Sequence, residues 1–301
     1  MRGYVALVLL LAAIWGASFM FIKIAVDELA PTTTMFLRLA FSAGPLVALV
    51  AYKLGAQRAW SELRAVTRAA VFLGVVNTAV PFTLIAWGET KIDSGVAAIG
   101  NASMPIFVAL LAFRFRKSER ATGSRLVGVA LGLVGVGVLA GVHPEGGWAG
   151  VAGTLAVVAA SLSYAIGTLY TQGILADVRN DVLAAASIAW GAVVAAPLGI
   201  DQAPSHLPSW GAIGSVLALA LLGTVAGQLI YFRLIYGYGS ARASLVVYLL
   251  PVTALFYGAL LLDEAITASA IAGLVLILTG TALGSGVLRM PRRREAVAAA
   301  P

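Results

Sequence analysis

The chain has 301 residues, 60% of them hydrophobic and only 11% charged, with a formal net charge of +7 at pH 7. Soluble domains are about 45–50% apolar and about 25% charged, so the composition excludes an ordinary soluble protein. The sequence holds no cysteine and two histidines, which excludes disulfide scaffolds, thiolate metal sites and cysteine nucleophiles. We therefore expect an integral membrane protein that needs no cofactor and no metal ion.

Uncharged runs predict the membrane spans. Nine runs of 19 to 31 residues contain no Asp, Glu, Lys or Arg, and a tenth apolar segment, residues 32–52, is interrupted only by Arg38. A helix needs about 20 apolar residues to cross the bilayer core, so the sequence predicts an all-α membrane protein with ten transmembrane helices joined by short loops. The nine uncharged runs are residues 3–22, 69–88, 94–113, 126–144, 146–176, 182–200, 202–232, 243–262 and 265–288.

The basic residues predict the orientation of these spans. If the N-terminus is cytoplasmic, 17 of the 20 basic residues fall in cytoplasmic segments, Lys91 alone falls on the opposite side, and Lys23 and Arg38 fall within spans. An excess of Lys and Arg marks the cytoplasmic side, so both termini are predicted to be cytoplasmic. These cations face anionic lipid headgroups, so the net charge gives no reason to expect a nucleic-acid partner. Residues 291–301 are expected to form a basic, disordered cytoplasmic tail.

The two halves of the sequence resemble each other. The matched pairs, at offsets of 145 or 146, are Ser94 with Ser240, Ala97 with Ala243, Pro105 with Pro251, Glu119 with Glu264, Thr122 with Thr267, Gly128 with Gly273 and Gly135 with Gly280. They divide the chain into two five-helix repeats, residues 1–145 and 146–290. Because five is odd, the second repeat would cross the membrane in the opposite sense. In secondary transporters built this way, the substrate site lies near the midplane between the repeats.

Several of these residues also resemble a known family. They are the run Trp15-Gly-Ala-Ser18-Phe19 with Lys23, Arg38 in the second span, the paired blocks Ser94-Gly-Val-Ala to Pro105 and Ser240-Ala-Arg-Ala to Pro251, and the paired Glu-x-x-Thr segments. Over residues 4–288 the chain resembles the EamA-type branch of the drug/metabolite transporter superfamily. The resemblance implies a ten-helix alternating-access carrier, commonly an exporter of amino acids or other small metabolites in a bacterial inner membrane. One departure is the run Arg114-Phe-Arg-Lys117 before Glu119, where the family usually has Leu-Gly-Glu.

Polar and aromatic side chains within the apolar spans predict the substrate site. Buried amides and hydroxyls must find hydrogen-bond partners, and a cavity near the midplane would supply them through water or ligand. For any single residue the alternative is an interhelical hydrogen bond, worth about 0.6 kcal/mol on average. The predicted lining residues are Trp15, Ser18, Asn77, Asn101, Tyr164, Thr168, Gln228, Tyr231 and Tyr248.

Two cations fall within predicted spans. Lys23 is near the end of the first span, and we favour an ammonium group that snorkels to the membrane surface while its stem stays in lipid. Arg38 is some 10 Å deep at about 1.5 Å per residue, where snorkelling is harder. For Arg38, binding a carbonyl or carboxylate of the protein and binding an anionic substrate are both open.

The acidic residues bear on energy coupling. All 13 fall at predicted helix ends or in loops, whereas proton-coupled carriers usually bury a titrating carboxylate within the bundle. The pattern therefore favours facilitated transport or exchange. Glu89, Asp93 and Asp263 are the remaining candidates for coupling or gating, although capping and loop solvation explain each of them more simply.

Prolines and glycines mark points of bending and close contact. Pro105 and Pro251 fall midway along their spans at matched positions, and because proline removes a backbone donor and bends a helix, they are predicted gating points. A static bend is the alternative. The glycines in residues 128–141 and 280–284 let helices approach closely, either within a monomer or at the seam of a weak homodimer.

These observations favour a membrane carrier of small molecules that rocks one repeat against the other. The alternatives are a passive channel, which an inverted repeat could also build, and an intramembrane enzyme. The enzyme is disfavoured because no convergent nucleophile, base and metal-ligand set is visible. An aromatic content of 9% and a largely uncharged lining favour a substrate with apolar character, such as a hydrophobic or aromatic amino acid.

Overall fold

The computed structural model describes residues 2–115, 124–141, 147–175 and 178–284. Within these ranges every regular element is a helix, and eight helical segments are long and apolar enough to cross a membrane. The protein is therefore an all-α membrane protein. The segments are Gly3–Val26, Pro31–Leu54, Thr67–Glu89, Ser94–Ala112, Gly147–Gly173, Asn180–Asp201, Trp210–Tyr238 and Ser244–Leu261.

Two of the ten predicted spans are shorter in the structure than expected. They correspond to the apolar helices Leu126–Ala140 and Ala268–Gly284. Part of the difference arises because residues 142–146 and 285–301 lie outside the described ranges, as do Glu119, Thr122 and the predicted C-terminal tail. The predicted boundary between the repeats also falls largely within residues 142–146.

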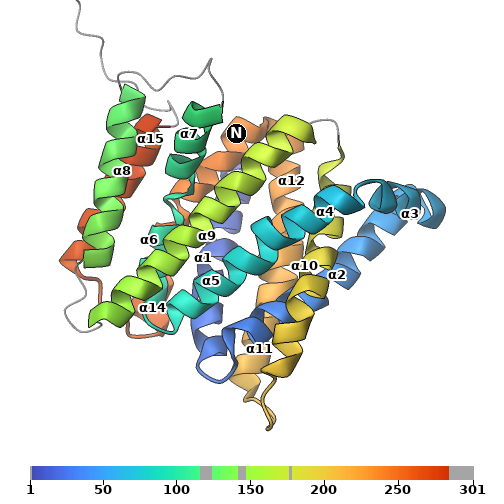
Figure 1. The fold of residues 1–301 in the computed structure, drawn as a ribbon, viewed down its shortest axis with the longest axis horizontal. Helices are drawn as coiled ribbons and strands as arrows, with labels where there is room; N and C mark the ends of the chain where they lie inside the picture. The colour runs from blue at the N-terminus through green and yellow to red at the C-terminus, as the bar shows by residue number, and fades with distance from the viewer. Residues whose placement is uncertain (1, 116–123, 142–146, 176–177, 285–301) are drawn as a thin grey trace, which may run out of the picture.

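The chain winds through the helices shown in Figure 1. The first half contains α1 (Arg2–Val26), α2 (Pro31–Leu54), α3 (Ala56–Ala65), α4 (Thr67–Gly74), η1 (Val75–Ala79), α5 (Val80–Glu89), α6 (Ser94–Asn101), α7 (Met104–Phe115) and α8 (Ser124–Gly141). The second half contains α9 (Gly147–Ile174), α10 (Asn180–Asp201), α11 (Trp210–Ala218), η2 (Leu219–Ala226), α12 (Gly227–Tyr238), α13 (Ser240–Ala243), η3 (Ser244–Tyr248), α14 (Leu250–Leu261) and α15 (Ala268–Gly284).

Local sequence explains several of the helix boundaries. Pro31 begins α2, a position where the missing N–H of proline costs no helical hydrogen bond. Gly55 ends the same helix with a φ of 80°, a conformation that glycine adopts without steric cost. Ser209 caps α11 because its hydroxyl accepts a hydrogen bond from the backbone N–H of Ala212.

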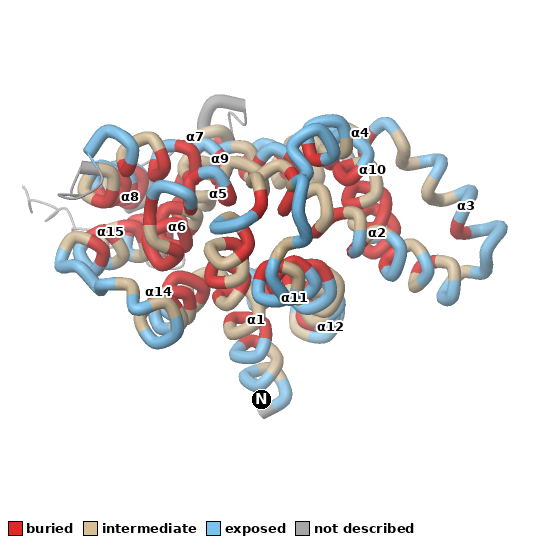
Figure 2. The backbone as a smooth tube through the Cα atoms, turned by 90° about the horizontal axis from the view of Figure 1, so that it is seen from below, coloured by how far each residue is buried: buried red, intermediate tan, exposed pale blue. Residues whose placement is uncertain are grey.

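The helices pack as two flanks around a central group. Figure 1 shows α8 and α15 side by side at one flank, and α2, α3 and α10 at the other. Between them lie α1, α5, α9, α12 and α14. Seen end-on in Figure 2, buried residues gather where helices face one another, whereas α3 lies exposed at the periphery. The main core cluster joins α1, α5, α6 and α9, with buried members such as Phe19, Ile85 and Val157.

Glycine allows the closest helix contact, between α8 and α15. A Cβ atom on Gly280 would lie only 2.5 Å from the backbone nitrogen of Gly132 and 2.6 Å from the carbonyl oxygen of Gly128. Small residues let transmembrane helices approach in this way. The glycine face predicted from the sequence is therefore occupied within the chain by the other half of the protein.

Candidate substrate site

A buried arginine lies at the centre of the bundle. Arg38 of α2 is only 7% exposed, and its Nε donates a 3.0 Å hydrogen bond to the hydroxyl of Thr224 in η2. Its guanidinium carbon lies 4.1 Å from the centroid of the Phe82 ring, a cation–π distance. Within the described ranges, Nη1 and Nη2 make no hydrogen bond. The Arg38 side chain thus has donors that no described acceptor engages.

Two pairs of aromatic side chains lie near this arginine, one in contact with it through Phe82 and one connected to it through Gly223. Tyr164 of α9 packs edge-on against Phe82 of α5, with ring centroids 6.4 Å apart. Trp15 of α1 and Tyr231 of α12 have centroids 5.4 Å apart. We call Arg38, Phe82, Tyr164, Trp15 and Tyr231 the central cluster.

A glycine leaves room beside the arginine. A Cβ atom added to Gly223 in η2 would lie 2.7 Å from the hydroxyl oxygen of Ser18 and 3.8 Å from Nη2 of Arg38. Ser18 is itself 6% exposed and donates to the carbonyl oxygen of Ile14 in its own helix. Ser18 and Gly223 therefore border the central cluster, and Gly223 lies between Arg38 and Trp15.

The two π-helical segments shape this region. In η1, the N–H of Val80 bonds to the carbonyl of Val75, five residues back, and the carbonyl of Val76 instead accepts a 2.6 Å bond from the hydroxyl of Ser163 in α9. In η2, the carbonyl of Gly223 accepts a 3.0 Å bond from Nε1 of Trp15. Such π-turns occur frequently at functional sites. Here each one presents a carbonyl to a side chain from the other half of the chain.

The remaining predicted lining residues lie at different places. Asn77 of η1 packs against Gly167 of α9, where an added Cβ atom would approach Oδ1 to 2.8 Å. Oδ1 of Asn101 is buried without a described partner, at the end of α6. Thr168 and Gln228 are half-buried, and within the described ranges no hydrogen bond or ring contact joins them to the central cluster. Tyr248 lies in η3.

Sequence reasoning missed Phe82 and Thr224. Phe82 follows Pro81 at the start of α5, and Thr224 is the one hydroxyl residue in the otherwise apolar segment 219–226. A buried arginine needs a hydrogen-bond acceptor, and this requirement is the one sequence feature that pointed to a residue such as Thr224. Which of the apolar helices would supply the acceptor depends on tertiary packing, which the sequence pattern does not reveal.

Both predicted gating prolines coincide with interrupted helices. Pro105 follows a break between α6 and α7, and Pro251 is the second residue of α14, directly after the 3-10 segment η3. A hydroxyl hydrogen bond to or from another helix lies near each break. Thr281 donates to Ala102 at 3.3 Å, and Thr253 donates to Ala12 at 2.9 Å. The breaks are thus tied to neighbouring helices, and their movement during transport stays a prediction.

Lys23 does not snorkel as expected. Its Nζ donates to the backbone carbonyls of Glu89 at 2.7 Å and Ile92 at 3.0 Å. Carbonyls at the C-terminus of α5 lack helical partners and attract a cation. Lys23 therefore fastens α1 to the turn between α5 and α6.

The acidic residues at this end differ from the expected loop solvation. Glu89 is fully buried, and neither of its carboxylate oxygens has a hydrogen-bond partner within the described ranges. Glu264 binds the start of α6 through the N–H and hydroxyl of Ser94, both at 2.8 Å. Asp93 occupies the N-cap position of α6 without a side-chain cap bond, so Glu264 supplies the cap from the other half of the chain.

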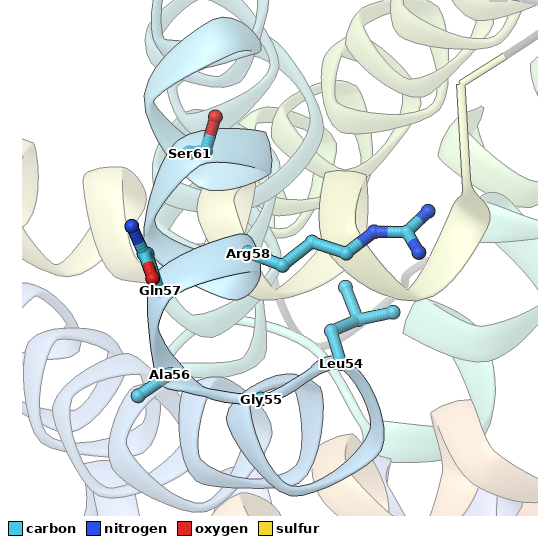
Figure 3. Close-up of a pocket in the computed structure, with 6 residues that line it drawn as sticks. All are labelled: Leu54, Gly55, Ala56, Gln57, Arg58 and Ser61. Carbon is cyan, nitrogen blue, oxygen red and sulfur yellow. The ribbon is translucent and has the colours of Figure 1, made fainter.

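Two surface concavities lie away from the central cluster. The first, of about 480 Å³, is at the junction of α2 and α3 (Figure 3) and is lined by Leu54, Gly55, Ala56, Gln57, Arg58 and Ser61. The second, of about 270 Å³, is lined by residues of α2, η1, α5 and α10, including Thr32 and Thr83. Neither is lined by Arg38 or its aromatic neighbours, so the candidate site rests on the contacts of the central cluster.

The long apolar helices define a multi-pass membrane protein. The chain belongs to the EamA-like transporter family, whose model matches residues 2–141 and again residues 151–285. It is similar to an uncharacterized transporter of Archaeoglobus fulgidus, with 30% identity over 266 residues that cover 88% of this chain and 92% of the relative. Its function is accordingly transmembrane transport.

The chain is also similar to a second relative and to a solved structure. An Escherichia coli K12 protein described as a "Probable amino-acid metabolite efflux pump" is 28% identical over 286 residues, covering 91% of this chain and 92% of the relative. A solved crystal structure superposes with a TM-score of 0.65 over 96% of this chain and 99% of the other, at 18% identity. That identity is low, so the likeness establishes a common fold and no more.

Proposed function

We propose that the protein is an alternating-access exporter of amino acids with hydrophobic or aromatic side chains. In this proposal residues 1–145 and 146–290 form two inverted five-helix repeats in a bacterial inner membrane, with both termini in the cytoplasm. The observation that carries the proposal is the buried Arg38 guanidinium, which has unpaired donors and lies against the Phe82 ring.

Helix pairing supports the inverted repeats. A two-fold relation between the halves exchanges α1 with α9, α2 with α10, α4–α5 with α11–α12, α6–α7 with α13–α14, and α8 with α15. The relation swaps the two members of the α2–α10 pair and of the α8–α15 pair, so each of these contacts is its own equivalent. The contact of α1 with α14 has its equivalent in the contact of α9 with α7. Both exchanged third segments contain a π-turn, and both fourth segments break before a proline. The family model also matches each half separately.

The chemistry of the central cluster supports an amino-acid substrate. A guanidinium is the side chain best suited to bind a carboxylate through paired N–H donors. A charge inside the membrane faces protein or a water-filled path and commonly marks a substrate pathway. The rings of Phe82 and Tyr164 supply apolar surface at that charge, and the Trp15–Tyr231 pair adds more beyond Gly223. Such surface suits a hydrophobic or aromatic side chain.

Transport by purified protein in liposomes tests the proposal. We expect preloaded phenylalanine to accelerate the entry of labelled phenylalanine, because trans-stimulation requires a carrier and is absent from a passive channel. We expect phenethylamine, which lacks the carboxylate, to be neither transported nor able to compete. Arg38→Gln should abolish the exchange, and Arg38→Lys should restore little of it because an ammonium cannot replace the paired donors.

Two outcomes would overturn the proposal. One is transport of phenethylamine at the rate of phenylalanine, since Arg38 would then have no carboxylate to bind. The other is phenylalanine flux without trans-stimulation, which would favour the channel. Arg233→Gln is the matched control, because Arg233 is exposed and we expect its replacement to leave exchange unchanged.

A further inference from the structure

The turn between α5 and α6 is bound by charged side chains from two other segments of the chain. From α1, Nζ of Lys23 donates to the carbonyl oxygens of Glu89 at 2.7 Å and Ile92 at 3.0 Å. From the turn after α14, the carboxylate of Glu264 accepts from the N–H and from the hydroxyl of Ser94, both at 2.8 Å. We call Lys23 and Glu264, with the groups that they bind, the latch.

Each charge of the latch lies at the helix end that attracts it. The last carbonyls of a helix carry a partial negative charge, and its first N–H groups carry a partial positive charge. Lys23 binds carbonyls at the end of α5, and Glu264 binds the first N–H groups of α6, including that of Gly95 at 3.2 Å. Asp93, at the N-cap position of α6, makes no side-chain cap bond. The α5–α6 turn therefore depends on other segments to satisfy the ends of both helices.

The end of α14 holds Glu264 in this position. The carbonyl of Gly258 accepts from the N–H groups of Leu262 at 3.0 Å and Glu264 at 3.1 Å. Asp263 between them has a φ of 53°, a left-handed conformation that is uncommon outside glycine. A Cβ atom added to Gly258 would overlap Oε2 of Glu264. The glycine thus leaves room for the carboxylate beside Ser94.

The latch lies at a closed end of the bundle. Buried apolar side chains fill the space behind the α5–α6 turn, including Ile22 of α1, Ile85 of α5 and Val96 of α6. Phe82 of the central cluster packs against the same group of side chains. We call this end of the bundle, where the α1–α2, α5–α6 and α14–α15 turns meet, the sealed end. The charge distribution of the sequence predicts that it faces away from the cytoplasm.

We propose that Lys23 and Glu264 are gate residues, which hold the sealed end shut and release the α5–α6 turn when a solute leaves there. The proposal rests on the carrier function proposed above, because alternating access requires each end of the bundle to open in turn. Opening separates the α5–α6 turn from α1, to which Lys23 ties it, and from the α14–α15 turn, to which Glu264 ties it. Water then replaces both sets of bonds, so the latch sets how often the sealed end opens.

The first test measures opening without any substrate. The chain has no cysteine, so Val96→Cys, at a position 5% exposed in the sealed end, gives a single thiol that a maleimide reaches when this end opens. A hydrogen bond to a charged group shifts an equilibrium by about tenfold to a hundredfold. We therefore expect Glu264→Ala and Lys23→Met each to raise the labelling rate of Val96→Cys by about tenfold or more.

Three controls separate opening of the sealed end from general loosening. Val50→Cys, 1% exposed in a different core cluster near the far end of α2, should keep its labelling rate in both latch variants. Lys91→Met removes an exposed cation from the α5–α6 turn, and Asp201→Asn removes an exposed acid at the end of α10. Neither should change the labelling of Val96→Cys. An unchanged rate at Val96→Cys in both latch variants would overturn the proposal, and so would an equal acceleration at Val50→Cys.

The second test ties the latch shut. In the double variant Ser94→Cys and Glu264→Cys, two thiols replace side chains that bond to each other at 2.8 Å, and a short bifunctional methanethiosulfonate joins them. We expect the joined protein to lose phenylalanine exchange in liposomes, because the α5–α6 turn can no longer leave the α14–α15 turn. A reducing agent should restore exchange, and each single cysteine variant treated alike should keep it. Full exchange by the joined protein would overturn the proposal, because Glu264 would then be a static cap.

The outcomes distinguish a failure of the latch from a failure of the carrier function. If wild-type protein exchanges phenylalanine but neither the tether nor the loss of Lys23 or Glu264 has an effect, the latch is wrong and the carrier function stands. If wild-type protein exchanges no amino acid, the carrier proposal fails. The labelling of Val96→Cys then decides alone whether the two residues hold the sealed end shut.

Discussion

Nε1 of Trp15 donates a 3.0 Å hydrogen bond to the carbonyl oxygen of Gly223, which lies 208 residues later in the chain. The bond joins α1 to the π-helical segment η2. Ser163 of α9 makes the corresponding bond to Val76 in η1, at 2.6 Å. A side chain of α1 and a side chain of α9 thus each bind a backbone carbonyl of a π-helical segment in the other half of the chain.

Replacing the indole tests this relationship. In Trp15→Phe the ring that packs on Tyr231 remains, but the carbonyl of Gly223 loses its donor. A buried polar group left unsatisfied costs about 1–3 kcal/mol, so we expect a lower thermal midpoint in detergent and weaker phenylalanine exchange. The matched control is Trp148→Phe, because Trp148 is 88% exposed. An unchanged midpoint for Trp15→Phe would mean that the bond contributes nothing to stability.

The α8–α15 contact makes a second prediction. In Gly280→Ala the new Cβ atom would meet backbone atoms of Gly128 and Gly132 at 2.5–2.7 Å, and backbone cannot move aside as a flexible side chain can. Overpacking of this kind costs about 1–3 kcal/mol, so we expect a lower thermal midpoint and a larger aggregated fraction on size-exclusion chromatography.

Gly137 of α8 provides the comparison. In the part of the chain that the structure describes, no atom outside its own helix lies within 4 Å of a Cβ atom built there, so Gly137→Ala should leave the midpoint unchanged or raise it. If the two alanine variants had the same thermal midpoint, the prediction that α8 and α15 approach closely at Gly280 would be wrong.

Hydrophobic runs and charge placement were enough to predict the helical membrane fold. An uncharged run about 20 residues long has one favourable solution in a bilayer, so segments such as 69–88 reappear in the structure as Thr67–Glu89. The π-turns and the exact helix breaks were not predicted. They depend on whether a neighbouring helix supplies a donor, as Ser163 does for Val76.

Side-chain environments were harder to predict than spans. Position near a helix end suggested snorkelling for Lys23 and solvation for Glu89, yet the first binds two carbonyls and the second is fully buried. In both cases packing by other segments of the chain decides the outcome, because α6 and the α14–α15 turn cover the end of α5. Arg38 was identified as buried, whereas its contacts with Phe82 and Thr224 became visible only in the fold.

The link between Glu28 and Ser209 predicts a pH dependence of stability. The hydroxyl and the backbone N–H of Ser209 both donate to the Glu28 carboxylate. These bonds, the hydroxyl's having the larger effect, lower the pKa of Glu28 below its ordinary value. An unfolded glutamate titrates near about 4.3. A depressed pKa in the folded protein gives stability that is complete above the unfolded value and is lost as the pH falls through the folded value.

Glu28→Gln should therefore lower the thermal midpoint at pH 7, and its difference from wild type should shrink as the pH falls below the unfolded value, because the folded wild-type carboxyl then takes up a proton. The measurement is the midpoint of each protein as a function of pH. Asp27→Asn, the neighbouring acid, serves as control and should run parallel to wild type. A difference between Glu28→Gln and wild type that persisted unchanged in acid would rule out the carboxylate as its source.

The last prediction concerns how Arg38 is oriented. Thr224 is a positioning residue, because its hydroxyl accepts from Nε of Arg38 and donates to the carbonyl of Leu219 at 3.0 Å. In Thr224→Val the shape is kept and the acceptor is lost. A hydrogen bond to a charged group is worth about 1.5–3 kcal/mol, so we expect KM for phenylalanine exchange to rise about tenfold to a hundredfold, with little change in the maximal rate. Thr224→Ser keeps the hydroxyl and should restore the wild-type KM. A loss of maximal rate that serine fails to rescue would indicate that Thr224 acts through packing and not through Arg38.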